Sequence, residues 1–110
     1  MGIVLPYPES KTPFAHRAQR LTKQECDSVL AETYLLMLSE LAIGVCIEND
    51  REYMIVFDCR GEPYFISRKN GMCYLLERSE TMVTSSQRFE EVLETLKILL
   101  KENQNKPVTS

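Results

Sequence analysis

The dipeptide Asn70-Gly71 is the sequence feature that most constrains how this chain can fold. Both residues tolerate a positive φ, which a type I′ turn requires, and that turn matches the twist of two antiparallel strands. A two-residue loop at this position places Lys69 opposite Met72. The pair therefore predicts a β-hairpin together with its register.

A third strand precedes this hairpin. Residues 53–58 are apolar and are followed by Arg60-Gly61-Glu62, which suits a three-residue loop with Gly61 in the left-handed region. Pro63 then begins the next strand, where its missing N–H does not interrupt a ladder. The stretch 53–77 is therefore predicted to form a three-stranded meander.

Strand alternation sorts the side chains of this meander into two faces. One face is aromatic and uncharged, and we expect it to be the core side: Tyr53, Ile55, Phe57, Phe65, Tyr74 and Leu76. The other face mixes apolar and charged side chains: Met54, Val56, Ile66, Cys73 and Leu75, with Asp58, Arg68 and Glu77. A slip of one residue at the first turn would exchange the two sets within residues 53–58.

Two helices flank the strands. Thr22 and Glu25 form a capping box, which predicts a helix from Lys23 to about Ala42 that is apolar around much of its girth. Gly44 ends this helix, and a short strand follows at residues 45–48. A second helix, capped by Ser85 or Ser86 after the polar connector 78–86, carries an apolar stripe at helical spacing: Phe89, Val92, Leu93, Leu96, Leu99 and Leu100.

This order of elements predicts an α+β fold, α-β-β-β-β-α, with a four-stranded antiparallel meander packed on two helices. Residues 1–21 are expected to be an extended arm, because Pro6, Pro8 and Pro13 prevent a helix from becoming established. Residues 22–103 are expected to form a single α+β domain, and residues 104–110 a flexible tail.

Composition excludes several classes of protein. No apolar run approaches the roughly 20 residues that a membrane-spanning helix needs, and no signal peptide is evident, so we expect a cytoplasmic location and no membrane partner. The cysteines lack C-x-x-C spacing and His16 is the single histidine, so we expect no metal site. We expect Cys26, Cys46, Cys59 and Cys73 to be reduced, although a disulfide between neighbouring strands stays open.

The charge distribution argues against nucleic acid as a partner. Residues 1–23 carry four basic side chains and Glu9, which gives net +3, whereas residues 24–110 are net −6. The second helix begins with an acidic sequence, 87–94, so its N-terminus does not suit phosphate. The strand aromatics could stack on bases, but a place in the core explains them more simply.

The sequence carries no recognisable catalytic constellation. His16 lies in the Pro-containing arm with no cysteine nearby, and neither phosphate-binding glycine motif is present. The carboxylate pairs fall in a helix start and a turn, where solvated surface is their ordinary role. We therefore expect neither an enzyme nor a cofactor.

The predicted function is that of a small non-catalytic protein-binding domain, such as an adaptor, an inhibitor or an immunity-type protein. Two helices suit one face of the sheet, which would leave the mixed face to bind a protein partner or a second copy in a homodimer. The predicted partner-binding residues are Met54, Val56, Asp58, Ile66, Arg68, Leu75 and Glu77.

Three alternatives stay open at this point. The arm could cover the mixed face with Ile3, Leu5, Tyr7 and Phe14. One helix could lie on each face of the sheet. The third is a small enzyme or ligand-binding domain with a pocket between the first helix and the sheet, lined by Tyr34, Cys46, Tyr74 and a carboxylate.

Overall fold

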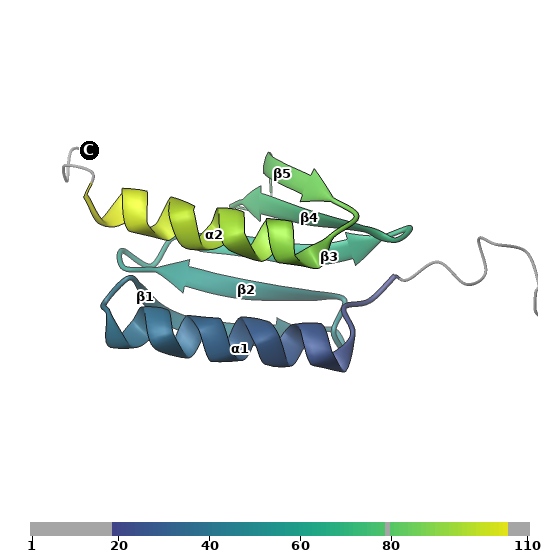
Figure 1. Cartoon of the computed structure of the whole chain (residues 1–110), viewed down its shortest axis with the longest axis horizontal. Coiled ribbons are helices and arrows are strands. Elements are labelled where there is room, and N and C mark those ends of the chain that lie inside the picture. The colour runs from purple at the N-terminus through teal and green to yellow at the C-terminus, as the bar shows by residue number, and fades with distance from the viewer. Residues whose placement is uncertain (1–18, 79, 106–110) are drawn as a thin grey trace, which may run out of the picture.

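The computed structural model describes residues 19–78 and 80–105 of the 110-residue chain. Its elements are α1 (Lys23–Leu38), β1 (Ala42–Glu48), β2 (Tyr53–Asp58), β3 (Pro63–Lys69), β4 (Met72–Glu77), β5 (Thr81–Ser86) and α2 (Phe89–Gln104). The strands form one antiparallel sheet in sequence order, and both helices lie on the same side of it (Figure 1). The α+β class is confirmed, with five strands rather than four.

The first helix is shorter than predicted because the chain turns back after Leu38. Glu40 has a φ of 61°, and the N–H of Leu41 donates to the carbonyl of Leu36 at 2.8 Å, which closes the helix end. The following apolar residues then begin β1 at Ala42. Apolar side chains continue through the turn, so hydrophobicity alone did not mark where the helix ends.

The fifth strand lies in the segment predicted to be a polar connector. β5 pairs with β4, with Tyr74 opposite Ser85 and Leu75 opposite Thr84. Its sequence, TMVTSS, lacks a regular apolar alternation because it is an edge strand with mostly exposed or half-buried side chains. The strand therefore gave no period-two signal in the sequence.

The predicted turn at Asn70-Gly71 is confirmed, and so is the left-handed conformation of Gly61, but the loop that contains Gly61 spans residues 59–62 and not 60–62. Asn70 and Gly71 have φ values of 55° and 81°, and Lys69 pairs with Met72. Gly61 has a φ of 85° between β2 and β3. These turns fix the register of the central strands, and the predicted division of their side chains into two sets is correct.

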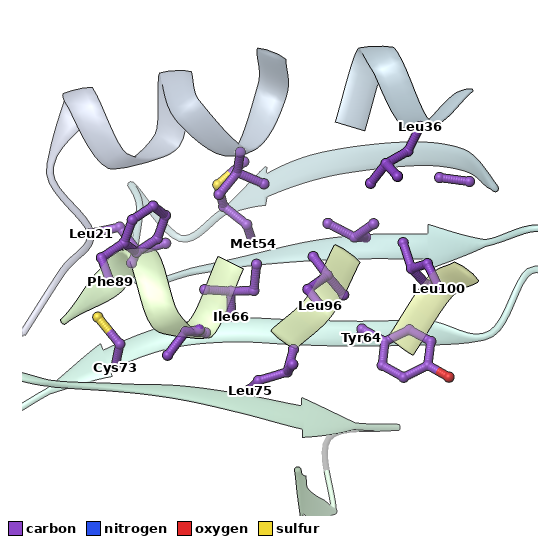
Figure 2. Packing of buried hydrophobic residues seen from close by; sticks show 14 of the residues in the cluster. Leu21, Leu36, Met54, Tyr64, Ile66, Cys73, Leu75, Phe89, Leu96 and Leu100 are labelled. Atoms are coloured by element: carbon purple, nitrogen blue, oxygen red, sulfur yellow. The ribbon is translucent and has the colours of Figure 1, made fainter. Parts of the chain in front are cut away.

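The prediction of which set faces the helices is wrong. Four predicted surface residues, Met54, Val56, Ile66 and Leu75, have no exposed surface. Figure 2 shows Met54, Ile66 and Leu75 in the layer between the sheet and the two helices. They pack with Val29 and Leu36 of α1 and with Val92, Leu96 and Leu100 of α2. Both faces are apolar, so alternation could say which residues share a face but not which face the helices cover.

The N-terminal boundary of the described fold is well anchored. Leu21, the last residue of the predicted arm, is fully buried, and its N–H donates to the carbonyl of Arg51 at 2.9 Å. Residues 1–18 of the predicted arm lie outside the described residues. The proposal that Ile3, Leu5, Tyr7 and Phe14 cover a sheet face lies outside them too.

Candidate interaction surfaces

The predicted partner-binding residues do not form a surface. Beyond the four buried apolar residues, Asp58 is 2% exposed and the side chain of Arg68 is 10% exposed, whereas Glu77 is half-buried at the end of β4. The sequence pattern suggested a charged rim. The structure instead gives Asp58 and Arg68 internal partners.

Asp58 holds the turn between β2 and β3. Its Oδ1 accepts hydrogen bonds from the N–H groups of Arg60 at 2.8 Å and Glu62 at 2.9 Å. Asn103 of α2 donates from Nδ2 to the hydroxyl of Tyr64 at 2.6 Å and lies 3.5 Å from Asp58 Oδ2. This buried polar cluster ties α2 to the sheet, and burial raises the pKa of Tyr64.

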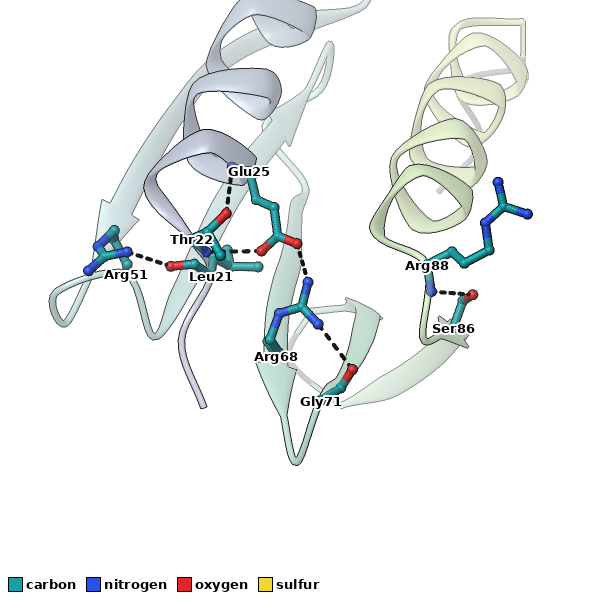
Figure 3. A network of polar contacts seen from close by, with 8 residues as sticks. All are labelled: Leu21, Thr22, Glu25, Arg51, Arg68, Gly71, Ser86 and Arg88. Carbon is teal, nitrogen blue, oxygen red and sulfur yellow. Dashed lines mark hydrogen bonds and ion pairs between the residues drawn. The ribbon is translucent and has the colours of Figure 1, made fainter. Parts of the chain in front are cut away.

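Arg68 joins the helix layer to the hairpin turn. Its guanidinium forms an ion pair with Glu25, the capping-box residue of α1, and donates to the carbonyl of Gly71 at 3.0 Å (Figure 3). Glu25 also accepts from the N–H of Thr22 at 2.9 Å, which confirms the predicted capping box. Arg68 is therefore a structural clamp between α1 and the turn that follows β3.

The aromatic face is the open face of the sheet. It carries the six side chains that the sequence assigned to the core, all now half-buried: Tyr53, Ile55, Phe57, Phe65, Tyr74 and Leu76. The rings of Tyr53 and Phe65 pack at a centroid distance of 5.8 Å and an angle of 40°. Neither described helix covers these side chains, because both lie on the other side of the sheet.

A groove runs across one end of this open face, where β2, β3 and β4 meet. It has a volume of about 510 Å³ and is lined by Gln19, Glu52, Tyr53, Ser67, Arg68, Lys69, Tyr74 and Leu76. Gln19 is held at its edge by Asn70, whose Oδ1 accepts from Gln19 Nε2 at 2.8 Å. The groove therefore combines an apolar floor with polar groups at one end of the strands.

A second apolar surface lies on the outer side of α1. Tyr34, Leu35 and Leu38 are 62%, 55% and 64% exposed, and Leu30 and Met37 beside them are 37% and 40% exposed. The sequence showed that this helix is apolar around much of its girth. Within the described part of the chain, only the side of α1 that faces the sheet is covered.

The pocket proposed between the first helix and the sheet is not assembled from the residues named for it. Tyr34 is on the outer side of α1, whereas Tyr74 lies on the open face of the sheet. Cys46 pairs with Ile55 and shares the open face with it. The space between α1 and the sheet is filled by the buried apolar cluster.

Three thiols of the described chain are poorly suited to nucleophilic chemistry. Burial raises the pKa values of Cys26, Cys46 and Cys73, which disfavours the reactive thiolate at each of them. Among residues 19–78 and 80–105, no group of three or more His, Cys, Asp or Glu side chains could hold a metal ion.

None of the helices in the described residues is both long and apolar enough to cross a membrane. In comparisons with protein-family models, with curated proteins and with solved structures, none matches this chain.

Proposed function

We propose that the protein is a non-catalytic protein-binding domain that receives an extended polypeptide segment on the open face of its sheet. The observation that carries this proposal is a set of six large apolar side chains on a sheet face that neither described helix covers, with Glu48 and Lys69 at the strand ends of the same face. Aromatic side chains are enriched in protein interfaces, where they bury a large area with little loss of conformational freedom. Adaptors, inhibitors and immunity-type proteins all act through such a surface.

The chemistry of the groove favours a peptide over a small polar metabolite. Its floor is formed by Tyr53, Tyr74 and Leu76, and the hydroxyl of Ser67 lies between the two tyrosines in the strand register. A metabolite site needs several polar groups that converge on one ligand. In this groove the polar groups lie at one end. An apolar side chain of the bound segment can therefore enter the groove, while the hydroxyls of Tyr53 and Tyr74 hydrogen-bond to the backbone of that segment.

The charge around the groove indicates what such a segment carries. Glu48, Asp50 and Glu52 gather at the β1–β2 corner, and Glu52 lines the groove itself. Arg20 lies 3.7 Å from Asp50 and 3.8 Å from Glu52, and Lys69 lines the groove together with Glu52, so this end of the groove carries charges of both signs. We therefore propose a partner segment with apolar or aromatic side chains at alternate positions and with polar residues at the end near Glu52 and Lys69.

A random-peptide library displayed on phage and selected against the full-length chain tests the proposal. We expect the enriched peptides to alternate apolar residues and to lose at least about tenfold in affinity, which is about 1.4 kcal/mol, against Phe65→Ser. Ile98→Ser, which removes an exposed apolar side chain from α2, is the matched control and should bind as the wild type does.

Two outcomes would overturn this proposal. One is enriched peptides that bind the wild type and a folded Phe65→Ser variant equally well. The other is a wild-type chain that enriches no peptide, while a variant with serine at positions 3, 5, 7 and 14 does enrich them. The occupant of the open face would then be the chain's own N-terminal segment instead of a partner.

A further inference from the structure

We propose that the outer side of α1 binds the same surface of a second copy, so that the chain forms a two-fold symmetric homodimer with its helices crossing near Leu35. This goes beyond the proposed peptide groove, because it concerns a different surface on the opposite side of the molecule. We define the α1 patch as Leu30, Ala31, Tyr34, Leu35, Met37 and Leu38.

The α1 patch brings several exposed apolar side chains together on one helix, which α2 does not do. Leu38 and Leu35 are more than half exposed in the last turns of α1. The outer side of α2, a helix of equal length, is occupied by side chains such as Glu90, Glu94 and Lys101, and Ile98 is its one large apolar residue that is exposed. A monomer would gain no stability from having leucine instead of such polar residues at these exposed positions of α1.

The shape of the α1 patch fits a copy of itself. Leu30, Tyr34 and Leu38 stand one turn apart and form a raised row, because residues four apart lie along one ridge of a helix. The neighbouring row holds the small Ala31 beside the large Leu35, so it has a hollow. A raised row from one copy can enter the hollow of the other, and a two-fold axis makes both contacts at once.

Charge also favours a copy as the partner at this surface. The full chain has a net charge of −3, so two copies repel each other wherever acidic side chains meet. Within residues 28–39, Glu32 is the single charged residue, and Lys97 of α2 holds it at 3.4 Å on the flank away from the patch. Asp27 and Glu40 are exposed just beyond the two ends of this segment, so two copies can bring the centre of the patch around Leu35 together without like charges meeting there.

The exposed apolar area of the α1 patch limits how tightly two copies are expected to bind. Full burial corresponds to about 100 Å² for a leucine side chain and about 200 Å² for an aromatic one. At the exposures observed, the patch offers about 300 Å² of apolar surface per copy, less than the apolar part of a standard interface of about 800 Å² per partner. We therefore expect a reversible dimer with a dissociation constant in the micromolar range.

Such a dimer would leave both peptide grooves accessible. The α1 patch lies on the helix side of the molecule and the groove on the open face of the sheet, with the whole core between them. Two grooves on one particle would bind a partner that carries two segments far more tightly than one groove does, by raising the effective concentration of the second segment.

Sedimentation velocity of the full-length chain, from about 1 to about 300 µM, tests the dimer. We expect the wild type to change from monomer to dimer across this range. Leu35→Lys and Leu35→Glu should each remain monomeric, and an equimolar mixture of the two should form a dimer again, because a crossing at Leu35 places the two charges together. Ile98→Lys on α2, where 53% of the side chain is exposed, is the matched control and should dimerise like the wild type.

The mixing step keeps the test independent of folding defects, and circular dichroism checks that each variant retains its helices. A wild type that stays monomeric at every concentration would overturn the proposal. So would folded Leu35 variants that dimerise as well as the wild type does, or a mixture that shows no recovery. Peptide binding on the open face is measured separately, so failure of the dimer leaves the proposed function untouched.

Discussion

The two faces of the sheet carry similar amounts of apolar side chain but have opposite roles. On the covered face, Met54, Val56, Ile66 and Leu75 are completely buried, whereas Phe57 and Phe65 on the open face are half-buried. These four covered side chains are aliphatic, and the aromatic Tyr64 on the same face is buried with them, because the side chains of two helices interdigitate with this face at close range. Apolar content alone therefore does not identify a core.

The charged residues of the covered face show a further difference between sequence pattern and burial. Charged side chains on the covered face made it resemble a rim in the sequence, yet Asp58 accepts backbone hydrogen bonds from a turn and Arg68 pairs with Glu25. Asp58 and Arg68 lie near the ends of their strands. At these positions the turns and the start of α1 supply hydrogen-bond and ion-pair partners. A charged residue at the end of a strand is therefore weak evidence for solvent exposure.

The largest expected effect comes from placing the same charge on the two faces. Val56→Glu puts a carboxylate without a partner into the core, which costs several kcal/mol and approaches the whole stability of a domain of this size. Ile55→Glu, one residue earlier on the open face, should cost about 1 kcal/mol. Urea denaturation followed by circular dichroism measures both, and equal losses would contradict the assignment of the two faces.

A smaller loss is expected when the buried polar cluster is broken. Asp58→Ala leaves the N–H groups of Arg60 and Glu62 without their acceptor, so we expect a loss of about 2–3 kcal/mol in the free energy of unfolding. Ser67→Ala on the open face is the control and should change stability by less than about 0.5 kcal/mol. If both variants unfold at the same urea concentration, Asp58 does not support the turn.

The same cluster predicts a change at alkaline pH. Burial raises the pKa of Tyr64, so the folded state holds the phenol proton more tightly than the unfolded chain does. The stability from this group is complete below the unfolded pKa of about 10 and is lost as pH rises through the folded pKa. Tyr64→Phe should therefore make the unfolding free energy less dependent on pH above about 10, and an unchanged slope would contradict this.

Sequence signals from neighbouring residues predicted much of this fold, but they did not predict the features that depend on contacts between distant segments. The capping box of Thr22 and the turn at Asn70-Gly71 depend on neighbouring residues, and both are confirmed. The end of α1 was missed because apolar side chains continue through its closing turn, and the polar edge strand β5 was missed because its side chains show no apolar alternation. The covered face was decided by how helix side chains fit the sheet, which no single segment of the sequence encodes, so the candidate site was first placed on the wrong face.

The smallest expected effect concerns Thr33, the one fully buried residue of α1 with a hydroxyl. Its Oγ1 has no hydrogen-bond partner among the described residues, although the side chain has no exposed surface. Thr33→Val removes a buried polar group while keeping a branched side chain of similar shape, and valine and threonine have similar helix propensities. We expect a gain of about 1 kcal/mol, seen as a higher urea midpoint, whereas the exposed Thr81→Val should change stability by less than about 0.5 kcal/mol. A loss of stability in Thr33→Val would mean that the hydroxyl has a bonding partner in the helix-covered layer, and that this layer tolerates polar groups more readily than its packing indicates.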